Sequence, residues 1–202
     1  MITLVFRLML LIVAVLLYLN GISSGFILPA IVWLHLVIGM MFRLIPNKRI
    51  SPGARKHFFA PEKPTLIQPK TNIHKGTVAI AIVWIVLNAF IFLLMHLTGL
   101  LIFEIALMVL LFYSVCDVAF IQFTCPFRLI FMRNRCCTTC RIYNWDFLMM
   151  VTPLILFPSL FSLSLITLAF AVFIRWEYAA WRYPERFAIE TNPQLCEGCE
   201  AK

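Results

Sequence analysis

Residues 77–97 read "TVAIAIVWIVLNAFIFLLMHL", and residues 100–123, "LLIFEIALMVLLFYSVCDVAFIQF", follow after only Thr98 and Gly99. A helix that crosses about 30 Å of hydrocarbon needs roughly 20 apolar residues, and each run has this length. Two such runs joined by a two-residue turn predict a transmembrane helical hairpin.

Further apolar runs lie on both sides of this hairpin. The predicted spans are residues 2–19, 22–42, 77–97, 100–123, 147–158 and 160–182. The last two come from one apolar segment, Asp146 to Tyr183, which as a single helix would be about 55 Å long and too long for one crossing. Pro158-Ser159 provides a break, and Pro153 predicts a kink in the fifth element. This fifth element is short, so we expect it to be tilted or re-entrant.

The composition agrees with a membrane protein. Hydrophobic residues make up 62% of the 202 residues and the mean hydropathy is +0.94, values that exclude an ordinary soluble globule. We therefore expect an all-α integral membrane protein, with residues 1–202 forming a single membrane domain of about six transmembrane helices. The net charge of +8 would suit nucleic-acid binding in a soluble protein. No aromatic-basic repeat or nucleic-acid motif accompanies that charge, so we expect no nucleic-acid partner.

The positive charge is concentrated in two long connections. Residues 43–75 contain eight Lys and Arg against one Glu, and residues 124–145 contain four Arg, whereas the opposite connections carry no charge. Cytoplasmic loops of membrane proteins collect Lys and Arg. The bias predicts that both connections, the tail 184–202 and both termini are cytoplasmic, in a plasma (inner) membrane.

Basic groups at this predicted cytoplasmic face are expected to meet lipid headgroups. Arg7 lies near the inner end of the first span, where its side chain can snorkel to the interface. The 43–75 loop contains five prolines, which exclude a continuous helix and favour an extended arm lying along anionic lipid. The alternative for this Pro-rich basic loop is docking of an acidic protein partner at the cytoplasmic face.

Cysteines form two C-x2-C knuckles, Cys137–Cys140 and Cys196–Cys199. Structural disulfides do not persist in a reducing compartment, so this spacing indicates metal binding or redox activity. Four thiolates make a tetrahedral shell suited to zinc or to a single iron. The hairpin of the last two spans leaves from the first knuckle and returns near the second. We therefore predict one metal site that joins the 124–145 loop to the tail.

The remaining cysteines leave alternatives open. Cys125 and Cys136 are possible additional ligands, and five or six thiolates could hold an iron–sulfur cluster instead. Reduced thiols or a redox switch without metal is the third possibility. We favour zinc, although the sequence does not decide between zinc and iron. Cys116, inside the fourth span beside Asp117, is expected to be a small apolar filler.

Apart from Arg7 and the charged residues near the end of the last span, four ionisable residues lie inside predicted spans: His35, His96, Glu104 and Asp117. Charged groups there mark functional sites by default. His96 and Glu104 flank the Thr98-Gly99 turn, so we expect them to pair across the hairpin. His35 and Asp117 lie at similar depth, about two turns from the inner ends of their spans. They could pair or line a path for protons or ions.

Three functions follow from these features. The first is a scaffold or subunit of a membrane complex, locked on its cytoplasmic side by a zinc tetrathiolate and recruiting a protein partner. The second is membrane electron transfer through iron at the same site. The third is ion or proton transport through His35 and Asp117. No recognised catalytic motif is present, so the sequence assigns no catalytic residue.

Overall fold

The computed structural model describes residues 2–23, 25–45, 73–123, 130 and 144–183, and these residues contain helices and turns but no strand. The elements in chain order are α1 (Ile2–Leu19), α2 (Ile27–Leu44), α4 (Ile73–Leu97), α5 (Phe103–Gln122), α6 (Asp146–Val151), the 3-10 helix η3 (Thr152–Leu156) and α7 (Leu160–Arg182). The described part of the chain is therefore all-α, as the sequence predicts.

Five of these helices are long and apolar enough to cross a membrane: α1, α2, α4, α5 and α7. Many of their large apolar side chains face outward, for example Leu160 at 90% and Ile85 at 67% exposure. Such a surface suits lipid and not water, which identifies an integral membrane protein. The α6–η3 segment rises only about 19 Å and is shorter than the hydrocarbon core.

Two of the turns between helices depend on a glycine in the left-handed region. At the end of α4, Gly99 has φ 70°, its N–H donates to His96 O at 3.2 Å, and Leu100 N–H donates to Met95 O at 2.9 Å. This pair of bonds is a Schellman motif, which satisfies the last carbonyls of a helix and reverses the chain. Gly21, with φ 66°, ends α1 in the same way.

Prolines and a serine cap shape the hairpin of α6, η3 and α7. Pro153 stands in the first turn of η3, where the chain changes from α to 3-10 geometry because proline has no N–H to donate. α7 begins at Leu160, directly after Pro158-Ser159, where the sequence predicts a break. The Ser159 side chain accepts a hydrogen bond from Ser162 N–H and so caps α7.

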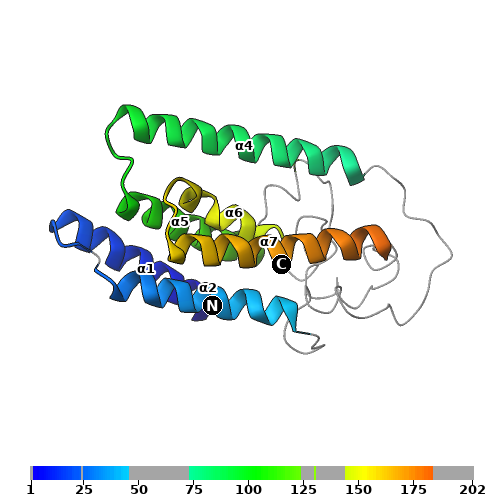
Figure 1. Ribbon diagram of the computed structural model, residues 1–202, viewed down its shortest axis with the longest axis horizontal. Coiled ribbons are helices and arrows are strands. Elements are labelled where there is room, and N and C mark those ends of the chain that lie inside the picture. Colours follow the sequence, from blue (N-terminus) through cyan, green and yellow to red (C-terminus); the bar gives the residue numbers. More distant parts are fainter. Residues whose placement is uncertain (1, 24, 46–72, 124–129, 131–143, 184–202) are drawn as a thin grey trace.

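Helix packing places the core between α1, α2, α5 and the hairpin. α1 lies along α5, α2 and α6 pack against α7, and η3 packs against α5. α4 stands at the edge of the bundle, and the short α1–α2 and α4–α5 turns lie at the end opposite to the C-terminal ends of α2 and α7 (Figure 1). The fully buried side chains at the centre include Leu36, Met40, Leu107, Leu110, Met150, Leu154 and Leu165.

Candidate functional site

A cluster of polar side chains around the buried Arg7 joins α1, α2 and α5. Arg7 donates from Nη1 to Asp117 Oδ2 at 3.0 Å and to the Ser114 carbonyl at 2.8 Å. Its Nε donates to His35 Nε2 at 3.2 Å. One guanidinium therefore contacts a carboxyl group, a backbone carbonyl and an imidazole on two other helices. We call Arg7, His35 and Asp117 the charge cluster.

The position of Arg7 corrects one expectation. The sequence predicts that Arg7 snorkels to the interface, whereas its residue is only 8% exposed and its charge is paired inside the bundle. The prediction is wrong because Arg7 shares a face of α1 with buried Leu10 and Ala14, three and seven residues further on. That face packs on α5, so the guanidinium finds acceptors inside the bundle.

His35 and Asp117, which the sequence places at similar depth, belong to the same cluster through Arg7. Arg7 lies between them, so neither residue needs the other as a direct partner. The Phe6 ring covers the imidazole, with the two ring centroids 5.1 Å apart. With His35 neutral, the cluster carries one positive and one negative charge. A balanced pair is the arrangement that low-dielectric surroundings tolerate best.

A second ion pair lies at the C-terminal end of α2. Arg43 Nη2 is 2.9 Å from Asp146 Oδ2, and the two side chains are 12% and 7% exposed. The Arg43 guanidinium also stacks on the Phe147 ring at 5.3 Å from its centroid. This pair attaches the start of α6 to the last turn of α2. Asp117 is close enough to interact electrostatically with both of its members, so the two ion pairs are neighbours.

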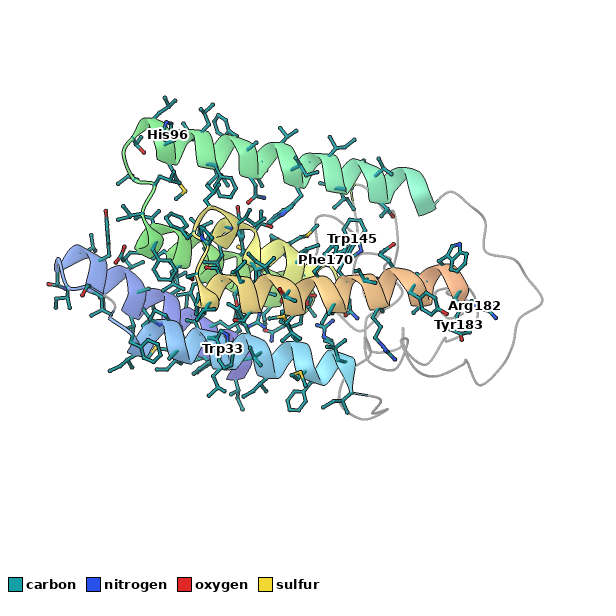
Figure 2. The ribbon with its side chains drawn as sticks, in the orientation of Figure 1. Trp33, His96, Trp145, Phe170, Arg182 and Tyr183 are labelled. Carbon is teal, nitrogen blue, oxygen red and sulfur yellow. The ribbon has the colours of Figure 1, made fainter. Side chains whose placement is uncertain are left out.

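The two remaining predicted polar residues, His96 and Glu104, do not meet. Within residues 73–123, neither a hydrogen bond nor an ion pair joins them. His96 lies exposed at the end of α4, beside the turn to α5 (Figure 2). Glu104 instead lines a cavity of about 10 Å³, room for about one water, together with Tyr18 and Leu107. The expected pair across the hairpin is therefore not formed.

A further polar contact attaches α4 to the bundle. Tyr113 Oη donates to Asn88 Oδ1 at 3.1 Å, and Asn88 Nδ2 donates to the Trp84 carbonyl at 2.9 Å. The Trp84 indole donates to Thr152 Oγ1 of η3 at 3.2 Å. These contacts cannot be predicted from the sequence alone. Their pairing requires knowledge of which face of α4 meets α5.

Of the predicted metal ligands and alternates, none lies in the described part of the chain. Cys125, Cys136, Cys137, Cys140, Cys196 and Cys199 are outside the described residues. Among the described residues, no group of three or more His, Cys, Asp or Glu side chains could hold a metal. Cys116 is described and is a free, partly buried thiol in α5.

A described residue that follows the first knuckle along the chain contacts one that precedes the second knuckle. Trp145 Nε1 donates to Glu177 Oε1 at 2.8 Å, which links the start of α6 to the last turns of α7. Trp145 also packs on the buried Trp176 and Ala180. Figure 2 shows Trp145 beside α7. We call Trp145, Trp176, Glu177 and Ala180 the hairpin clamp.

Comparison with known proteins identifies no relative of this chain. No protein-family model matches this chain, and neither a curated protein nor a solved structure shows significant similarity to it.

Proposed function

We propose that this protein is a scaffold or subunit of a membrane complex whose cytoplasmic face carries a tetracysteine metal site. Cys137, Cys140, Cys196 and Cys199 would be the ligands, with zinc favoured over iron. The observation that supports this proposal is the hydrogen bond between Trp145 and Glu177. Trp145 follows the first knuckle along the chain and Glu177 precedes the second, so their contact brings the two segments that lead to the knuckles together.

The reach of the chain supports the proposal. Trp145 lies five residues after Cys140, and Glu177 lies nineteen residues before Cys196. An extended chain spans at most about 3.3–3.6 Å per residue, so Cys140 lies within about 18 Å of Trp145. From Glu177, α7 continues to Arg182, and the thirteen residues that follow Tyr183, up to Cys196, can span about 43 Å, which is enough to cover this distance. Both knuckles can therefore approach one ion without any change in the described bundle.

The hairpin clamp gives such a site a fixed base. Trp176 is fully buried against Trp145, and the indole of Trp145 holds the Glu177 carboxylate. A metal bound by both knuckles would close a loop around α6, η3 and α7. Structural metal sites contribute directly to folding free energy, so this closure would stabilise the hairpin.

The proposed orientation puts the clamp on the cytoplasmic side. Positive charge concentrates in residues 43–75 and 124–145, and the positive-inside rule assigns those connections to the cytoplasm. The exposed aromatic residues Tyr178 and Trp181 and the basic Arg182 near the end of α7 suit the headgroup level at this face. A soluble partner would meet the protein there, since the opposite turns carry no charge.

The charge cluster supports a structural role over transport. Arg7 occupies the space between His35 and Asp117 that a transported cation would need. A fixed guanidinium repels cations electrostatically, so Asp117 serves as its counter-ion and not as a carrier site.

Metal analysis of the purified full-length protein tests the proposal. We expect about one zinc per chain and no visible absorption. Cys140→Ser and Cys199→Ser should each lower the metal content, whereas Cys116→Ser, which alters a thiol inside α5, should retain it. Iron with charge-transfer bands would replace the scaffold proposal by the redox alternative. A metal-free protein with normal stability would overturn both.

A further inference from the structure

The charge cluster contains a histidine whose present contact requires one protonation state. An arginine nitrogen can only donate, so His35 Nε2 must accept the bond from Arg7 Nε. His35 is therefore neutral in this arrangement, with its proton on Nδ1. Asp117 and the Ser114 carbonyl take the other bonds of the same guanidinium.

We propose that the charge cluster is a proton-binding site that controls how firmly α1 is held against α2. A hydronium ion would transfer its proton to the lone pair of His35 Nε2, which forms an N–H bond there and leaves a water molecule. The Arg7 Nε–H···Nε2 hydrogen bond would break because Nε2 could no longer accept it. The cluster would then hold two cations and one carboxylate, so its net charge would change from zero to +1.

The consequences for the two helix contacts differ. Arg7 would keep its bonds to Asp117 and Ser114, which hold α1 on α5. Its contact with α2 would change from attraction to repulsion between two adjacent cations, in partly buried surroundings that screen charges less than bulk water does. Because Arg7 supplies the polar contact between α1 and α2, protonation should loosen α1 from α2 and leave α5 in place.

The other charged groups near His35 do not offset the added charge. α5 contributes Asp117, already paired with Arg7, and the partly buried thiol of Cys116. Arg43, eight residues along α2 and so about 12 Å away, is paired with Asp146 of α6.

The remaining packed element, α7, brings no charged group close. Ser164 of α7 accepts a hydrogen bond from Trp33, which fixes the level of α7 beside His35. The first charged residue along α7 is Arg175, eleven residues beyond Ser164 and about 16 Å along the helix. An added proton on His35 therefore remains without a free counter-ion among the described side chains around it.

The sign of the pH dependence follows from the geometry. The folded cluster requires neutral His35, whereas an imidazole released from it can bind a proton. The disrupted state thus binds more protons, and stability rises with pH and falls in acid. One proton changes the unfolding equilibrium constant by at most about tenfold per pH unit.

Unfolding of the full-length protein in detergent, measured between pH 8 and pH 5, tests this inference. We expect the unfolding constant of the wild-type protein to increase in acid, and that of His35→Gln to change much less, since an amide oxygen accepts from Arg7 without titrating. His96→Gln is the matched control and should behave as the wild type, because His96 is exposed at the end of α4.

Hydrogen exchange on the wild-type protein provides a readout that needs no variant. Amides of α1 should lose protection at pH 5, after correction for intrinsic exchange rates, while amides of α5 keep theirs. Unchanged protection of α1, or an equal acid response in His35→Gln, would overturn the inference. Metal content plays no part in either measurement, so this result and the test of the proposed function are independent.

Discussion

The Arg7 side chain joins three helices, because it lies on α1 and bonds to His35 of α2 and Asp117 of α5. Replacing Asp117 by Asn would leave the Arg7 charge buried without a counter-ion, and breaking a buried pair in this way typically destabilises by about 3–5 kcal/mol. We expect Asp117→Asn to lower the free energy of unfolding in detergent by this order, measured by denaturant titration.

The matched comparison for this pair is a double variant. Arg7→Met removes the other charge, so Arg7→Met with Asp117→Asn should be more stable than Asp117→Asn alone. Glu104→Gln provides the control, because Glu104 forms no ion pair within the described part of the chain. If the double variant lost as much free energy of unfolding as the two single variants lose together, the energetic coupling between Arg7 and Asp117 would be refuted.

Gly39 is a second position where one side chain decides a helix contact. A Cβ atom there would lie 3.0 Å from Cζ of Phe147, so the Phe147 ring of α6 packs against α2 where glycine leaves room for it. Gly39→Val should destabilise the protein by about 1–3 kcal/mol. Gly39→Ala should cost much less, since its gain in helix propensity of about 1 kcal/mol offsets a smaller overlap. Thermal unfolding would measure both.

Phe147→Leu tests the cause of the Gly39 effect. A shorter side chain at residue 147 gives room for the added valine, so Gly39→Val with Phe147→Leu should be less destabilised than the two single effects predict together. If the two losses of stability simply added, the valine would destabilise the protein through contacts other than the one with Phe147.

At the scale of elements, the N-terminus of α7 depends on the Ser159 cap. The Ser159 hydroxyl accepts from Ser162 N–H at 3.2 Å. Ser159→Ala should lower the free energy of unfolding by about 1 kcal/mol, and Ser159→Thr, which keeps the hydroxyl, by much less. Chemical denaturation would measure the difference, and equal effects of the two variants would argue against the cap.

The residues at the ends of the helices explain which helix bounds could be predicted. The first and last spans match exactly, as Ile2–Leu19 and Leu160–Arg182, because a glycine turn and the Pro158-Ser159 pair mark their ends. The sequence predicts that the second span begins at residue 22, whereas α2 begins at Ile27. The residues between are apolar or small, so hydropathy alone cannot separate turn from helix there.

At the scale of the whole molecule, the sequence predicts the elements better than their contacts. α1 is apolar around most of its surface, so no stripe marks the face that meets α5, and the burial of Arg7 could not be inferred. The similar depth of His35 and Asp117 could be predicted from their distance to the span ends. Their link through Arg7 could not, since it depends on which helices are neighbours.

The proposed orientation makes a prediction for the whole molecule. Asn20→Cys and Thr98→Cys place thiols in the two short turns at the uncharged end of the bundle. In intact cells, a membrane-impermeant maleimide should label both variants and leave the wild-type protein unlabelled, because its own cysteines would face the cytoplasm or lie in α5. Labelling of either variant only after permeabilisation would reverse the proposed topology.

The same experiment distinguishes a hairpin of α6, η3 and α7 that crosses the membrane twice from one whose tip ends within it. The turn between η3 and α7 lies set back from the other two turns in Figure 1, and the α6–η3 segment rises about 19 Å against about 30 Å for the hydrocarbon core. Pro158→Cys, which is exposed in that turn and leaves the Ser159 cap intact, should therefore be labelled far more slowly than Thr98→Cys. Equal labelling rates would mean that the hairpin reaches the outer surface and crosses completely. Slow labelling would mean that its tip ends within lipid, with the hairpin clamp attaching both of its arms at the cytoplasmic side.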